Sequence, residues 1–215
     1  MMTTLKKIVL DIMLVGGICS PVLYMLTDIA GAQHYSGYSF KDQAVSELFA
    51  IGAPTANVVV IFFTISSLLM LLFSVGVWLS SNDSRILRVL SIVILANAID
   101  SLILWNFFPM HMRGIQPTFT DTMHGILAIN PFVLISIILG AVHFRNWFRL
   151  YSIITILLLL ATATTAFSYV PLVISNKPTP WMGLTERMGQ YVHQVWHAAL
   201  AIVLLRANAV KKLSS

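Results

Sequence analysis

The chain has 215 residues, of which 58% are hydrophobic and only 10% are charged, whereas soluble domains usually carry about 25% charged residues. A soluble domain of this length could not bury so much apolar surface, so the composition excludes a purely soluble fold and indicates that lipid is part of the solvent. The net charge of +5 does not indicate nucleic-acid binding, because the basic residues lie in short runs between apolar segments, as topology signals do.

Six apolar segments follow one another along the chain, each near the length of about 20 residues that a helix needs to cross a membrane. Polar turns such as Ser80-Ser81-Asn82-Asp83 separate them. Asn130-Pro131, inside the fourth segment, predicts a kink. The sequence therefore predicts an all-α protein, a polytopic transmembrane bundle of six helices in one domain over residues 1–215. The predicted spans are Ile8–Ala30, Ala56–Leu79, Ile86–Phe108, Met123–Phe144, Leu150–Val173 and Gly189–Leu205.

The basic residues are distributed unevenly between the two sides of this predicted bundle. With a cytoplasmic N-terminus, nine Lys and Arg side chains lie on the cytoplasmic side and four on the outer side. Short loops follow the positive-inside rule, so both termini are predicted to be cytoplasmic in a multi-pass protein of the inner (plasma) membrane. The nine are Lys6, Lys7, Arg85, Arg88, Arg145, Arg149, Arg206, Lys211 and Lys212, and the four are Lys41, Arg113, Lys177 and Arg187.

The outer connections are longer than the inner ones, and longer loops more often carry function. The first of them, Gly31–Thr55, is predicted to hold a short interfacial helix near Ser39–Ile51. It also carries Ser46 beside Glu47, which makes this serine a candidate catalytic residue. Five of the six histidines fall on the outer side, so any chemistry is expected there.

Asp100 lies inside the third predicted span, where an ionisable side chain is costly and normally faces the interior of the bundle. One interpretation makes Asp100 a proton carrier or a catalytic base, with Glu47 as the alternative base. The other makes it a hydrogen-bonded residue that holds helices together. The sequence leaves both interpretations open.

His193 and His197 are four residues apart in the last predicted span, which places both imidazoles on one face of a helix, about 6 Å apart. This is the usual spacing of two histidine ligands of one metal ion. His124 begins the fourth span at a similar depth and is the predicted third ligand, with zinc as the expected metal. Interfacial histidines also commonly bond water, lipid headgroups or loop carbonyls, and this alternative stays open.

Glu186 and Arg187 are predicted to begin the last helix on the outer side, just before the span, where a glutamate in a first helical turn suits the helix dipole. Arg187 is predicted to pair with Glu47 or to hold a lipid phosphate. Together with His111, these two residues are the candidates for binding a lipid or a protein partner at the outer face.

Several short segments resemble a known family. Ser46–Pro54, Phe108-Pro109, His124-Gly125 and Gly183–Arg187 are similar to motifs of the multi-pass membrane proteins catalogued as domain of unknown function 998. The resemblance implies a prokaryotic six-helix membrane protein of no established activity. It also implies that Ser46, Glu47, His124 and Arg187 belong to one outer site.

A weaker similarity concerns the metal-dependent membrane hydrolases of the alkaline ceramidase and adiponectin receptor type. Those proteins carry an H-x-x-x-H pair in the last helix, as His193 and His197 do, and Asp, Ser and His upstream, for which this chain offers Asp100 and His124. The chain departs from them in having six predicted helices rather than seven and in carrying its third histidine on a different helix.

Three functions follow as hypotheses. The first is a non-enzymatic membrane protein that binds a lipid or a protein partner through its outer face. The second is a zinc-dependent hydrolase of a lipid amide or ester, in which a metal-bound water attacks. The third is a small transporter with Asp100 on its pathway. Under all three hypotheses the protein is expected to contact membrane lipids and not nucleic acid. Whether it is an enzyme stays open.

Overall fold

The computed structural model describes residues 4–145 and 147–213, and within them every long element is a helix. Three short elements interrupt or extend the long helices: the π-helical turn η2 (Asp100–Leu104), α4 (Trp105–Phe107) and α8 (Val170–Ile174). A 3₁₀ turn, η1 (Val45–Leu48), lies in the first long loop. The long helices are α1 (Thr4–His34), α2 (Ala56–Ser80), α3 (Arg85–Ile99), α5 (Phe119–Ala128), α6 (Pro131–His143), α7 (Trp147–Ser168) and α9 (Met182–Leu213).

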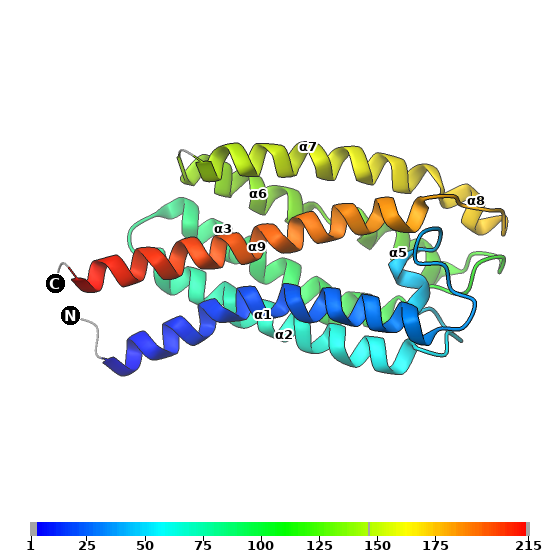
Figure 1. Cartoon of the computed structure of the whole chain (residues 1–215), viewed down its shortest axis with the longest axis horizontal. Helices are drawn as coiled ribbons and strands as arrows, with labels where there is room; N and C mark the ends of the chain where they lie inside the picture. Colours follow the sequence, from blue (N-terminus) through cyan, green and yellow to red (C-terminus); the bar gives the residue numbers. More distant parts are fainter. Residues whose placement is uncertain (1–3, 146, 214–215) are drawn as a thin grey trace.

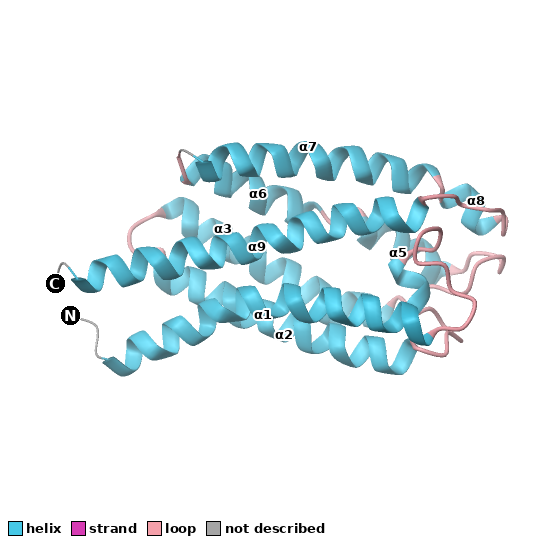
Figure 2. Cartoon of the chain, in the orientation of Figure 1, coloured by secondary structure: helices cyan, strands magenta, loops and turns pink. Residues whose placement is uncertain are grey.

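These helices make six passes along one common axis (Figure 1), which confirms the predicted bundle. The third pass is α3 continued by η2 and α4, the fourth is α5 followed by α6, and the fifth is α7 continued by α8. The start of α1 and the end of α9 lie at one end of the bundle. The loops 35–55, 108–118 and 175–181 gather at the other end (Figure 2), which we call the loop end. Which side of the membrane the loop end faces stays a prediction.

Five of the six passes have the length and apolar composition of membrane-spanning helices, and α9 is the sixth pass. It falls short in hydropathy because polar residues such as Gln190 and His193 occupy its half near the loop end. Nevertheless α9 has 32 residues, about 48 Å of helix, and packs along α1 and α7. It begins at Met182, seven residues before the predicted span, because the polar residues that masked its start in the sequence are bonded to the first loop.

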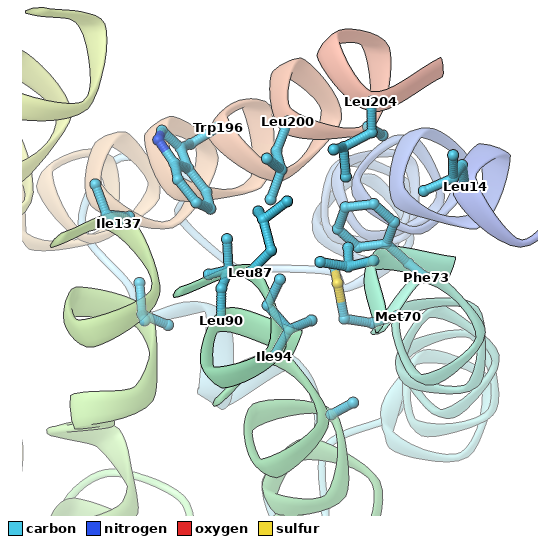
Figure 3. Close-up of a cluster of buried hydrophobic side chains, with 14 of the residues drawn as sticks. Leu14, Met70, Phe73, Leu87, Leu90, Ile94, Ile137, Trp196, Leu200 and Leu204 are labelled. Carbon is cyan, nitrogen blue, oxygen red and sulfur yellow. The ribbon is translucent and has the colours of Figure 1, made fainter. Parts of the chain in front are cut away.

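A tightly packed apolar core fills the half of the bundle away from the loop end. Phe73, Leu90, Ile137, Trp196 and Leu200 are fully buried there and come from four different passes (Figure 3). Lipid is as apolar as these side chains, so close packing rather than the hydrophobic effect stabilises their contacts. The half nearer the loop end is built differently, from polar contacts and a cavity.

Small residues let α1 and α2 approach closely. A Cβ atom at Gly16 would lie 2.7 Å from the carbonyl oxygen of Leu69, and the Ser20 and Ser66 hydroxyls are 3.0 Å apart across the same interface. Such contacts between small and hydroxyl-bearing residues are typical of helices that associate in a membrane.

The fourth pass breaks at Asn130, as Asn130-Pro131 predicted. Asn130 adopts a left-handed conformation (φ 30°) and Pro131 begins α6, because a proline has no N–H to continue the preceding helix. The Asn130 amide donates to Asn97 Oδ1 of α3 at 2.8 Å. Beyond the break, α6 packs against α3 and α7, whereas the substantial packing of α5 in the described chain is against α4 alone.

Candidate functional site

The most deeply buried charges at the loop end form an ion pair between the last helix and the first. Arg187 Nε and Nη2 donate to Asp28 Oδ2 and Oδ1, each at 2.9 Å, and both side chains are at most 1% exposed. Tyr191 donates its hydroxyl to the same carboxylate at 2.5 Å. Two parallel charge-assisted hydrogen bonds of this kind fix geometry as well as charge, so the pair joins α9 to α1.

The rest of the Arg187 guanidinium is also occupied. Nη1 donates to the carbonyl oxygens of Phe40, Gln43 and Gly183 at 2.8, 2.9 and 3.2 Å, and Nη2 donates to the Tyr38 hydroxyl at 2.6 Å. The Phe40 ring lies under the guanidinium, 3.9 Å from its carbon. Each of the three guanidinium nitrogens therefore already donates within the protein.

A second buried ion pair joins the first and second long loops. Arg113 Nε and Nη2 donate to the two oxygens of Glu47 at 2.7 and 2.6 Å, and the Glu47 carboxylate is fully buried. Gln43 Nε2 and the Ala44 amide also donate to this carboxylate, each at 2.9 Å. The hydrogen bonds that Arg113 donates to Glu47 raise the pKa of the Arg113 guanidinium.

One predicted pairing is corrected by these contacts, because Arg187 pairs with Asp28 and not with Glu47. Glu47 accepts four hydrogen bonds, so its geometry favours a structural role for the carboxylate. Lipid binding by Arg187 and base catalysis by Glu47 stay predictions. Gln43 connects the two pairs, because its backbone carbonyl accepts a hydrogen bond from Arg187 while its side-chain amide donates one to Glu47.

The predicted interfacial helix near Ser39–Ile51 is only the single turn η1. Side chains of the segment bond its own backbone instead of leaving it free to form a helix: the Ser39 amide donates to Gln43 Oε1 and the Asp42 amide donates to Ser39 Oγ. Asp42 also accepts from the Trp181 amide, which lowers the pKa of its carboxyl. The first loop is thereby fastened to the segment that precedes α9.

His111 is occupied by the start of α5. Its backbone amide donates to Asp121 Oδ1 at 2.7 Å, and its ring Nδ1 lies 2.9 Å from Asp121 Oδ2. The same carboxylate caps α5 by accepting from the Thr118 amide. His111 thus positions α5 beneath the second long loop, and both residues line the mouth of the cavity described below.

Asp100 and His124 both contact Trp105, which belongs to the third pass. Trp105 Nε1 donates to Asp100 Oδ2 at 3.1 Å across the π-helical turn, and the Trp105 and His124 rings lie edge to face at 4.6 Å. His124 Nδ1 is 3.0 Å from the Phe108 carbonyl oxygen. The Asp100 carboxylate does not line the cavity, so its geometry favours a hydrogen-bonding role over a catalytic one.

Exchanging Asp100 for asparagine is therefore expected to leave the free energy of unfolding nearly unchanged, because the amide oxygen can still accept from Trp105. Asp100→Leu leaves that N–H without a partner and is expected to cost about 1–3 kcal/mol. Thermal and denaturant unfolding in mild detergent measures both. An Asp100→Asn protein that unfolds as readily as Asp100→Leu would show that the negative charge itself is needed.

A cavity of about 720 Å³ opens at the loop end and runs into the middle of the bundle. Its walls are mostly apolar, and at its inner end it reaches Met70, Ala98 and Val133 of the apolar core. All six passes contribute to it, represented by Tyr24, Phe63, Asn97, Gly125, Ala163 and His193.

One polar stripe follows α9 along this cavity. Its residues recur at helical spacing and all of them line the cavity: Glu186, Gln190, His193, Gln194 and His197. Glu186 lies at the outer end, where it accepts from the Val45 amide at 3.3 Å. His197 lies eleven residues further along, about 16 Å deeper at helical rise. Ser46 lines the cavity at the loop end, near Glu186.

The three histidines predicted as zinc ligands are not gathered into one group. His193 and His197 lie together, with ring centroids 5.9 Å apart, as their spacing predicted. Among the residues that the structure describes, however, no three His, Cys, Asp or Glu side chains are placed to share a metal ion. His124 points its Nδ1 at a backbone carbonyl instead, and the zinc site stays a prediction.

Sequence reasoning missed three residues that shape this end of the molecule: Asp28, Arg113 and Gln194. Asp28 could have been found from the sequence, because it is an acidic residue near the outer end of an otherwise apolar span and such a residue requires a partner. Arg113 carried no comparable signal, because a basic residue in a loop is ordinary. Gln194 becomes informative only once the helical face it shares with His193 and His197 is known to line a cavity.

A comparison with protein-family models matches residues 18–203 to a family described as protein of unknown function (DUF998). No curated protein and no solved structure matches the chain. The resemblance carried by the short motifs is thus confirmed, whereas the similarity to metal-dependent hydrolases stays a prediction.

Proposed function

The chain belongs to the DUF998 family of multi-pass membrane proteins, and we propose that it binds an amphipathic, lipid-like molecule in the cavity between its six passes. The observation that carries the proposal is the cavity itself. Its volume of about 720 Å³ falls in the range of about 300–1,000 Å³ that is common for small-molecule sites.

The lining of the cavity matches an amphipathic molecule better than a fully polar or a fully apolar one. Apolar side chains of the other passes, such as Phe63 and Leu134, face the polar stripe of α9. A hydrocarbon chain complements these apolar side chains, and a hydrogen-bonding group complements the polar stripe. A water-soluble polar ligand would leave the larger, apolar part of the wall without a complementary surface.

The break at Asn130 supports access from the lipid. Ile129, which follows α5, and Phe167 of α7 line the cavity and are 66% and 40% exposed. Since α6 packs against α7 and α5 does not pack comparably against it, the contacts support a second, lateral opening of the cavity between α5 and α7. A lipid-like molecule would enter through this opening without crossing water.

We also propose that the loop end faces the outside of the plasma membrane. Four Lys and Arg residues belong to that end, namely Lys41, Arg113, Lys177 and Arg187, against nine at the end that holds the start of α1 and the end of α9. Because an excess of Lys and Arg in short loops marks the cytoplasmic side, this count supports the orientation.

Filling the cavity tests the proposed function. Ala163→Phe places a ring in the cavity from α7 and is expected to lower the affinity for a fluorescent long-chain alcohol at least about tenfold, since the lost volume excludes the alkyl chain. Binding is measured by fluorescence titration of the purified protein in detergent, beside mass spectrometry of lipids that copurify with it.

Ala161→Phe is the matched control, because Ala161 is on the same helix, is exposed, and does not line the cavity. This variant is expected to bind the probe and the copurifying lipids as the native protein does. Equal probe binding by the native protein and both variants would contradict the proposal.

A further inference from the structure

The inner end of the cavity holds a concentration of polar atoms without partners. In the described part of the chain, four buried side-chain N or O atoms lack a hydrogen-bond partner, and all four belong to residues that line this cavity. They are Nδ1 and Nε2 of His197, Oε1 of Gln194 and Oδ1 of Asn130. We call these three residues the cavity floor.

The cavity floor lies deep in the bundle. His197 is 1% exposed, follows the core residue Trp196, and meets the core residue Phe73 edge to face at 6.4 Å between ring centroids. Asn130 bonds Asn97 next to Ala98, where the cavity reaches the core. Because hydrocarbon offers no hydrogen bonds at this depth, these atoms need a partner inside the cavity.

Native proteins pair the large majority of their buried polar atoms, and each unpaired one is destabilising. Four such atoms on the lining of one cavity, with none elsewhere in the described residues, therefore indicate a group that occupies the floor. A neutral imidazole offers one donor and one acceptor, and the two amide oxygens are acceptors. The complementary group must both donate and accept, as a hydroxyl or a primary amide does.

The Asp, Glu, Lys and Arg residues around the cavity provide no permanent counter-charge for an ionised group at the floor. The Asp, Glu, Lys and Arg residues among the cavity-lining residues are Arg113, Asp121 and Glu186, and all three lie at the loop end. Glu186 is about 16 Å from the level of His197 along α9. A carboxylate or an ammonium group at the floor would be buried without a counter-charge, which is strongly unfavourable.

We propose that the cavity floor binds the uncharged hydroxyl or primary amide group of a lipid-like molecule, with His197 and Gln194 as its hydrogen-bonding partners. This inference rests on the proposed function and names the class of ligand: a long-chain alcohol or amide and not a fatty acid or a lipid amine. The apolar part of the ligand lies against α2, α5 and α7, and the polar group is held against α9.

The test compares three competitors of equal chain length, an alcohol, a primary amide and a carboxylic acid, at a pH where the acid is ionised. Each displaces the fluorescent long-chain alcohol from the purified protein. The alcohol and the amide are expected to bind at least about tenfold more tightly than the acid. His197→Phe keeps the ring and removes both nitrogens, and it is expected to weaken alcohol binding about tenfold.

His143→Phe is the matched control, because His143 lies near the end of α6 away from the loop end, outside the cavity; it is expected to leave all affinities unchanged. Gln194→Met is a second floor variant of similar volume and should weaken alcohol binding as His197→Phe does. Thermal unfolding verifies that each variant is folded.

An acid that binds as tightly as the alcohol would overturn the inference. So would floor variants that are folded and retain the native affinity for the alcohol, since this result would mean that water alone satisfies the floor. In both cases the loss of binding in Ala163→Phe would still support the proposed function. A native protein that binds none of the probes would instead remove the proposed function itself.

Discussion

Replacing Asp28 by leucine is expected to lower the free energy of unfolding by about 3–5 kcal/mol, the usual effect of removing one partner of a buried ion pair. The substitution leaves the Arg187 guanidinium buried without a counter-charge, and it removes the acceptor of Tyr191. Denaturant unfolding of the purified protein in mild detergent measures the change.

Two further variants define the origin of this effect. Asp28→Leu combined with Arg187→Met removes both charges and is expected to recover at least half of the lost stability, because apolar replacements of a buried pair are often tolerated. Asp83→Leu is the control at an exposed ion pair, where Asp83 and Arg88 are 3.8 Å apart, and should change little. An Asp28→Leu protein as stable as Asp83→Leu would refute the structural role of the pair.

Gly183→Ala is expected to have the second largest effect, a loss of about 3 kcal/mol, at the upper end of the usual cost of overpacking. A Cβ atom here would collide with the Gln43 carbonyl oxygen and lie 2.7 Å from that of Phe40. Both are backbone atoms, which cannot rotate away, and both accept hydrogen bonds from Arg187. The start of α9 would have to move away from the first loop and weaken this cluster.

Gly125→Ala provides the comparison, because a Cβ atom at this position of α5 meets nothing within 4 Å. Alanine favours a helix over glycine by about 0.5–1 kcal/mol, so this variant should be as stable as the native protein or slightly more stable. Thermal unfolding of the two variants side by side measures the contrast, and equal stabilities would mean that the first loop does not sit against α9 as described.

The six-helix bundle could be predicted from the sequence because membrane spans depend on local properties, namely the length and apolarity of a segment. The break at Asn130 was equally local, since proline acts on its immediate neighbours. The start of α9 was misplaced for the opposite reason. Its polar residues belong to a helix only because the loop residues Phe40 and Gln43 and the α1 residue Asp28 bond Arg187, and these contacts span more than 140 positions.

The candidate site was predictable only in part. The spacing of His193 and His197 placed them on one face, and the structure bears this out. Their surroundings could not be predicted from the spacing, because the cavity is lined by residues of all six passes, and their arrangement depends on long-range packing. Glu47 and Arg187 do lie at the same end of the bundle, and their bonding partners Arg113 and Asp28 could be identified only in three dimensions.

The low hydropathy of α9 has a consequence for how the protein is made. A helix carrying Glu186, Arg187 and a stripe of amides and histidines is a poor substrate for insertion by itself, since charged and polar residues oppose translocon-mediated insertion. The compensating groups are on α1 and the first loop, which are synthesised long before. We therefore expect α9 to insert against a surface that α1 and the first loop have already formed.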